Sequence, residues 1–117
     1  MVGSWKCSCA WSHLVYFLQQ IIPVADDCDG KMVIHPDDLL FSTLGLLRVL
    51  STANDLQYLV DLVPSLNNGL WFCTGSFGVW DDNDLPEMGK QFVERINFIH
   101  LHSTTHFASF STYYYNK

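Results

Sequence analysis

The fold of this chain is set by a stretch in its second half, Leu70-Trp71-Phe72-Cys73-Thr74-Gly75-Ser76, in which a short apolar run ends at a cysteine and passes into small polar residues. Such a run, bounded by turn-forming residues, is typical of a strand that is buried on both faces. Two further stretches have the same form: Lys31-Met32-Val33-Ile34 leads to His35, and Ile96-Asn97-Phe98-Ile99 leads to His100. Each predicted strand therefore carries a possible metal-binding side chain at its carboxyl end.

The segments between these strands have the spacing of helices. Apolar positions within residues 11–25 recur every three or four residues, which predicts a one-faced helix, with Pro23 bending its last turn or starting a new one. A second helix is predicted after Ser51 or Thr52, either of which can cap it, and a third from near Asn83. The residues expected to face inward from these two helices are Leu56, Leu59, Val60, Val63, Leu85, Met88, Phe92 and Val93. This alternation predicts an α/β fold, with about three βα units and parallel strands.

The three strand ends are expected to meet. Right-handed crossovers bring the carboxyl ends of parallel strands to one side of the sheet, where α/β enzymes place their chemistry. We therefore expect His35, Cys73 and His100 to form one metal site. Two imidazoles and a thiolate suit Zn, Fe, Co or Mn better than Mg or Ca. Taken singly, each residue is more often structural, but their equivalent positions on successive units favour a shared site.

Polar residues that follow the strands are candidates for substrate contacts. Asp37 and Asp38 could orient the first histidine or bind substrate hydroxyls, although aspartates after a strand also form turns and caps. Thr74 and Ser76 could present backbone N–H groups to an anionic substrate, or could form a plain turn within a loop spanning residues 74–82.

The composition is that of one small domain or a piece of a larger one. The chain has 117 residues, 49% of them hydrophobic, and a formal net charge of −6 with only six lysines and arginines. This charge argues against nucleic acid or an anionic membrane as a partner. No segment reaches the roughly 20 apolar residues of a membrane span. With neither an apolar leader after Met1 nor a disulfide framework among the four cysteines, we expect a cytoplasmic protein.

Several blocks of the sequence together resemble one enzyme family. The blocks are Ile22-Pro23-Val24-Ala25, Ile34-His35-Pro36-Asp37-Asp38, Gly45-Leu46-Leu47-Arg48-Val49, Asn68-Gly69 with Phe72-Cys73-Thr74-Gly75-Ser76, Asp82-Asn83-Asp84-Leu85, and Arg95-Ile96 with His100-Leu101. In order and spacing, from about Trp11 to about Thr104, they resemble the mannonate dehydratases.

The resemblance implies a fold, a reaction and a cofactor. The fold is a TIM (β/α)8 barrel, and the reaction is dehydration of D-mannonate to 2-dehydro-3-deoxy-D-gluconate in hexuronate and glucuronate catabolism. The cofactor is Mn2+ or Fe2+. By the same resemblance, His35, Cys73 and His100 match three of the metal ligands, and a fourth ligand, an aspartate, would lie beyond Lys117.

The resemblance also has limits and departures. Residues 1–117 read as a single partial barrel domain, with residues 11–104 family-like and residues 1–10 and 105–117 atypical. Two leucines, Leu39 and Leu40, stand where the family usually has prolines, and His102 replaces a usual arginine. The imidazole lacks the bidentate geometry of a guanidinium. With His100 and His106, His102 makes a cluster that could bind metal opportunistically.

About three of eight barrel units are accounted for, so we expect a homo-oligomer or association through the open barrel edges. One alternative function is that of a catalytically incomplete remnant, acting at most as a metal-binding or interaction fragment. Another is a segment of an unrelated sugar-isomerase-type barrel with a similar metal site.

Overall fold

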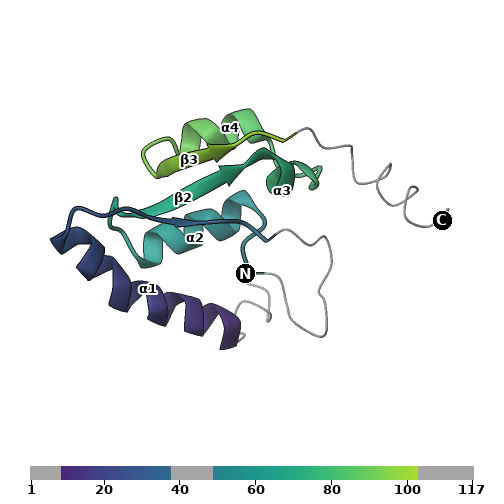
Figure 1. Ribbon diagram of the computed structural model, residues 1–117. Helices are drawn as coiled ribbons and strands as arrows, with labels where there is room; N and C mark the ends of the chain where they lie inside the picture. The colour runs from purple at the N-terminus through teal and green to yellow at the C-terminus, as the bar shows by residue number, and fades with distance from the viewer. Residues whose placement is uncertain (1–8, 38–48, 103–117) are drawn as a thin grey trace.

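The computed structural model describes residues 9–37 and 49–102 and shows an open three-stranded parallel sheet with helices packed on it (Figure 1). In chain order the elements are α1 (Cys9–Asp27), β1 (Met32–Ile34), α2 (Ala53–Leu62), β2 (Asn68–Cys73), α3 (Thr74–Gly78), α4 (Leu85–Gln91) and β3 (Ile96–His100). The strands lie in the order β1-β2-β3 and both pairings are parallel. The α/β fold class predicted from the alternation of helices and strands is confirmed.

β2 is the central strand, and its start is tightly enclosed. Met32 of β1 pairs with Asn68, and Cys73 at the end of β2 pairs with His100 of β3. At Gly69 a Cβ atom would lie 2.7 Å from the carbonyl oxygen of Met32 and 2.0 Å from the side-chain nitrogen of Asn97. Glycine is therefore required where the three strands begin to pair.

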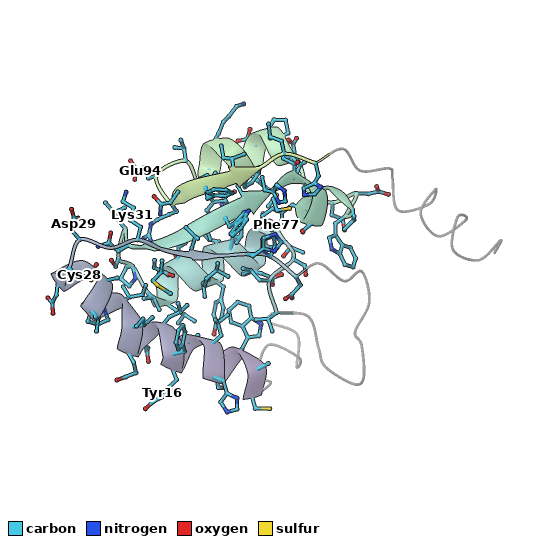
Figure 2. All side chains as sticks on the ribbon, in the orientation of Figure 1. Tyr16, Cys28, Asp29, Lys31, Phe77 and Glu94 are labelled. Atoms are coloured by element: carbon cyan, nitrogen blue, oxygen red, sulfur yellow. The ribbon has the colours of Figure 1, made fainter. Side chains whose placement is uncertain are left out.

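One face of the sheet packs against the helices and forms the core. Leu70 and Phe72 of β2 point to this face because alternate side chains of a strand point to opposite sides. In Figure 1, α1 lies along the β1 side of the sheet, and α2 and α4 lie behind the strands. Figure 2 shows Phe77 inside the molecule, whereas Tyr16 projects outward from α1. The core cluster comprises Trp11, Leu18, Ile22, Leu50, Leu56, Leu59, Val60, Val63, Leu70, Phe72, Phe77, Met88 and Phe92.

The first helix contains a proline in its interior. α1 continues through Pro23 to Asp27, so the alternative that Pro23 starts a new helix was wrong, and a bend of the last turn stays a prediction. The buried face of α1, which includes Leu18 and Ile22, outweighs the loss of one backbone hydrogen bond at the proline. The chain then turns at Asp29, whose φ of 54° is the left-handed conformation common just after a helix.

The later helices begin as predicted, whereas the predictions for Val93 and for residues 74–78 differ from the structure. Thr52, rather than Ser51, caps α2, and it forms a capping box with Asp55. Val93 is 65% exposed, so the prediction that it faces inward was wrong; the helix ends before it, at Gln91. Residues 74–78, predicted to be loop, form the short helix α3. The segment has a low helix propensity because it contains two glycines, but the buried side chain of Phe77 packs it against the core.

The loop before β2 joins α1 to the start of β3. The hydroxyl of Ser65 and the side-chain amide of Asn67 both donate to the carboxylate of Asp26, at 2.5 and 2.7 Å. These hydrogen bonds hold the pKa of Asp26 below its ordinary value of 3.8, and the bond from Ser65 has the larger effect. From the other side, the guanidinium of Arg95 donates to the carbonyl oxygens of Ser65 and Asn68. Three elements are thus held at the amino ends of the strands, opposite the predicted site.

The outer strand β3 carries large apolar side chains that solvent reaches. Phe98 is 50% exposed, Ile99 57% and Leu101, just past the strand, 79%. Exposed side chains on both faces of one edge strand form a surface that further protein could cover. Within residues 9–37 and 49–102, no helix has the length and apolar character needed to cross a membrane.

Candidate metal centre

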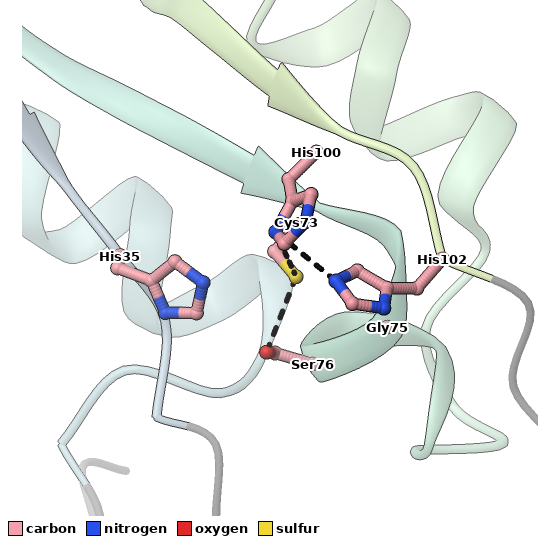
Figure 3. Close-up of a pocket in the computed structure, with 6 residues that line it drawn as sticks. All are labelled: His35, Cys73, Gly75, Ser76, His100 and His102. Atoms are coloured by element: carbon pink, nitrogen blue, oxygen red, sulfur yellow. Dashed lines mark hydrogen bonds between the residues drawn. The ribbon is translucent and has the colours of Figure 1, made fainter.

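The three predicted ligands lie together at the carboxyl edge of the sheet. His35 directly follows β1, Cys73 is the last residue of β2, and His100 is the last residue of β3. One ligand atom from each lies within 4.8 Å of those from the other two. They line an open cavity of about 390 Å³ together with Gly75, Ser76 and His102, the residues drawn in Figure 3. The structure thus brings together the trio chosen from the sequence, and its role in metal binding remains a prediction.

The ring of His35 is oriented by the backbone. Its Nδ1 lies 2.7 Å from the carbonyl oxygen of Pro36, which can only accept a hydrogen bond. In the neutral ring, Nδ1 therefore carries the proton and Nε2 is the nitrogen with the available electron pair. A backbone carbonyl bound to the distal nitrogen is a common way of fixing the orientation of a histidine ligand. Figure 3 shows the ring facing Cys73 across the cavity.

The sulfur of Cys73 lies at the centre of the cluster. The side chain is only 2% exposed, and Sγ is 3.9 Å from Nδ1 of His100. The hydroxyl of Ser76, one turn further on in α3, donates to Sγ at 3.4 Å. The turn that follows β2 therefore holds the sulfur toward the cavity. Ser76 both contacts this sulfur and lines the cavity.

Thr74 connects the ends of β2 and β3. Its hydroxyl donates to the carbonyl oxygen of His102 at 2.9 Å and accepts from the backbone N–H of the same residue at 2.7 Å. The hydroxyl also lies 3.4 Å from the carbonyl oxygen of His100. The Thr74 side chain thus secures the chain on both sides of the last strand's end, and its predicted role in substrate binding stays a prediction.

The aspartates after β1 are only partly covered by the structure. One oxygen of Asp37 accepts the backbone N–H groups of Val49 and Leu50, at 2.6 and 2.9 Å. These bonds join the end of β1 to the segment that leads into α2, as expected for an aspartate in a turn or cap. The predicted contact of this carboxyl group with substrate stays a prediction. Asp38 lies outside the described residues.

Sequence reasoning did not select Trp71, which lies on the cavity side of β2. The centroid of its ring lies 5.1 Å from that of His35, 6.1 Å from that of His100 and 4.5 Å from that of Phe98. Among the described residues, its buried indole Nε1 has no hydrogen-bond partner. The sequence could have indicated this position, because Trp71 is two residues before Cys73 and side chains two residues apart in a strand lie on the same face.

The donor set fits a divalent transition metal. Two imidazole nitrogens and one thiolate sulfur are borderline and soft donors, which favour Zn2+, Fe2+ or Co2+ over Mg2+ or Ca2+ and also accommodate Mn2+. Three protein ligands leave a coordination position for water or substrate, as in catalytic metal sites. The arrangement at the carboxyl ends of consecutive parallel strands is also the position of active sites in α/β barrels. Fold and cluster together have the form of a segment of an α/β protein with a candidate metal site at the carboxyl edge of its sheet.

The comparisons with known proteins identify the family. Residues 6–115 match the model of the D-mannonate dehydratase (UxuA) family. Because the match covers nearly the whole sequence, this chain belongs to that family. The resemblance noted in the sequence is confirmed.

The relatives are much longer than this chain. Mannonate dehydratase of Saccharophagus degradans is 52% identical over 90 residues, which are 77% of this chain and 23% of the relative. Mannonate dehydratase 2 of Agrobacterium fabrum is 46% identical over 93 residues, 80% of this chain and 23% of the relative. The crystal structure of mannonate dehydratase from Streptococcus suis superposes with a TM-score of 0.71 at 35% identity, covering 77% of this chain and 26% of that one. The chain therefore spans about a quarter of the length of the relatives it matches.

Proposed function

We propose that this chain is a segment of a mannonate dehydratase, a hydro-lyase that converts D-mannonate to 2-dehydro-3-deoxy-D-gluconate in the cytoplasm. The observation that carries the proposal is the cluster of His35, Cys73 and His100, whose ligand atoms lie within 4.8 Å in a chain of this family. We assign these residues as ligands of Mn2+ or Fe2+. When bound, such an ion supplies Lewis-acid stabilisation for negative charge on the oxygens of the sugar acid.

The residues around the cluster would bind and orient the sugar acid. Asp37 and Asp38, after β1, and Thr74 and Ser76, after β2, are our candidates for contacts with its hydroxyls and carboxylate. Ser76 supports this assignment because it lines the cavity and contacts the sulfur of Cys73. Asp37 is placed two residues after His35 and would also hold the first ligand in position.

We further propose that turnover needs barrel units beyond those described. Acid and base groups for the loss of a hydroxyl must contact the substrate, and the described cavity offers mainly ligand-type side chains. The exposed Phe98 and Ile99 make the β3 edge the surface where another copy or another segment would pack.

A second candidate function is a metal-binding fragment without dehydratase activity. It is favoured by the coverage of about a quarter of the curated relatives, which leaves most of a barrel unaccounted for. The two functions share the metal cluster and differ in turnover.

Two measurements test these proposals. Purified chain is incubated with D-mannonate and Mn2+, and formation of the 2-keto-3-deoxy acid is followed. Turnover by the 117-residue chain alone would show that the described units suffice and would exclude the second candidate. Metal content is then compared in the wild-type chain, His35→Ala and Cys73→Ala, with the exposed His13 and Cys28 as matched controls in His13→Ala and Cys28→Ala. Unchanged binding of Mn2+ or Zn2+ in the first two variants would refute the shared site.

A further inference from the structure

We propose that His102 is a fourth protein ligand, so that this chain holds its ion with three imidazoles and one thiolate. The inference rests on the proposed metal site and extends it by one residue. His102 lies two residues beyond His100, on the segment that follows β3, and its ring lines the same cavity (Figure 3).

The distance between the two imidazoles fits a shared ion. Nε2 of His102 lies 3.1 Å from Nδ1 of His100, and the ring centroids are 3.9 Å apart. With metal–nitrogen bonds of about 2.0–2.1 Å, two nitrogens on one tetrahedral ion are separated by about 3.3 Å. The observed separation is close to that value, but the contact is a hydrogen bond, so one of the two nitrogens carries a proton. Binding of one ion by both rings therefore releases that proton and turns both electron pairs toward the ion.

The backbone of His102 is held in a way that fixes where its ring can go. The hydroxyl of Thr74 accepts from the N–H of His102 and donates to its carbonyl oxygen. A residue on an exposed segment would normally lose side-chain and backbone freedom on binding an ion. Because the backbone is already held, less of that freedom remains to be lost, and the ligand is partly preorganised.

A glycine makes room for the ring. A Cβ atom at Gly75 would lie 2.8 Å from Cβ of His102 and 3.0 Å from its Cγ. Any other residue at position 75 would push the His102 side chain away from α3 and out of its present place. Two neighbouring residues, Thr74 and Gly75, thus secure and accommodate the same histidine.

A fourth ligand changes the chemistry that the site favours. Three histidines and one cysteine complete a tetrahedral shell, the arrangement that structural zinc sites use, whereas catalytic sites keep one position open. The proposal therefore predicts that His102→Ala lowers the affinity for tetrahedral Zn2+ or Co2+ more than the affinity for Mn2+, the ion assigned to the three-residue site. Binding of a sugar acid would then require His102 to leave the ion.

The test counts imidazoles directly. The 117-residue chain, labelled with 15N in its histidines, is loaded with 113Cd2+, and scalar couplings between cadmium and ring nitrogens are recorded. Three coupled histidines are expected, and His102→Ala should remove one of them while leaving those of His35 and His100. Zinc affinity, measured by competition with a chelator, should fall at least about tenfold in His102→Ala, since loss of even an indirect partner of a ligand costs that much.

Two further variants complete the design. Gly75→Ala retains every ligand but should also weaken coupling to His102, because the added methyl group displaces its ring. His13→Ala, on the exposed side of α1, should leave couplings and affinity unchanged.

The outcomes separate the two levels of the proposal. Coupling to His35 and His100 alone, or a third coupling that survives His102→Ala, overturns the role of His102 and leaves the three-residue site intact. If the Co2+-loaded chain lacks a thiolate-to-metal charge-transfer band, Cys73 is not a ligand and the proposed metal site itself fails.

Discussion

Replacement of Asp37 by alanine should destabilise the chain, because its carboxylate holds two segments together. One oxygen accepts the backbone N–H groups of Val49 and Leu50, and the N–H of Asp37 donates to the carbonyl oxygen of Leu50 at 2.9 Å. Asp37→Ala removes the two bonds to the carboxylate and leaves two donors in a part-buried position without that acceptor. The end of β1, which carries His35, would lose its connection to the segment that leads into α2.

The expected loss follows from those bonds. A hydrogen bond to a charged group contributes about 1.5–3 kcal/mol, and the two here share one oxygen, so we expect the free energy of unfolding to fall by about 2–4 kcal/mol. Asp37→Asn keeps an oxygen acceptor without the charge, and should cost about 1 kcal/mol. With a urea m-value of about 1–3 kcal/mol/M, the alanine variant should unfold at a midpoint lower by about 0.7–4 M.

The assay is urea unfolding followed by tryptophan fluorescence at one fixed protein concentration, because any association of the chain would make stability depend on concentration. Asp27→Ala is the matched control, since Asp27 is an exposed aspartate at the end of α1, on the side of the sheet where β1 begins. An unchanged midpoint in Asp37→Ala would refute the structural role, and if D-mannonate binding were then lost, Asp37 would be a substrate contact alone.

Three further predictions concern the same framework. Gly69→Ala should lower stability by at least about 2 kcal/mol in thermal melts, because the added methyl group meets the carbonyl oxygen of Met32 at 2.7 Å and backbone cannot move aside cheaply; an unchanged melt would contradict the tight pairing. Thr52→Ala should cost about 1 kcal/mol in urea unfolding through loss of the α2 cap, and Thr52→Ser should recover most of it. Asp26, whose pKa is lowered mainly by the hydroxyl of Ser65, stabilises the fold above its ordinary pKa of 3.8 and loses that effect as pH falls through the lowered value. The stability difference between wild type and Asp26→Asn should therefore shrink over that range, and a difference independent of pH would contradict it.

The strands and most helix faces could be predicted because local patterns agree with the tertiary structure. β2 was recognisable from an apolar run and a glycine before it, and α2 from a capping residue followed by regularly spaced leucines. A new helix starting at Pro23 was one of two alternatives because local propensity disfavours an interior proline, whereas burial of the α1 face keeps the helix continuous. α3 was missed because Thr74, Gly75 and Ser76 read as a turn, whereas the helix is stabilised by burial of Phe77 in the core cluster.

For the candidate site, topology could be predicted but side-chain orientation could not. Parallel strands with metal-type residues at their ends must bring those residues to one edge, so the meeting of His35, Cys73 and His100 followed from chain order alone. The position of the His102 ring depends on the hydroxyl of Thr74 and on the space left by Gly75. Both residues belong to a segment far from His102 in the sequence. No local sequence pattern indicates that the space beside Gly75 is filled by a histidine from another segment.

The central position of β2 also governs how the chain emerges during synthesis. Met32 of β1 pairs with Asn68, so β1 is made before the strand that it binds. At about 5–20 residues per second, the ribosome leaves β1 and the apolar face of α1 waiting for times on the order of seconds. In that interval the nascent segment is a substrate for chaperones and a site of misassociation. Slower translation of residues 35–67 would lengthen the wait, so the choice of codons there should influence the yield of correctly folded chain.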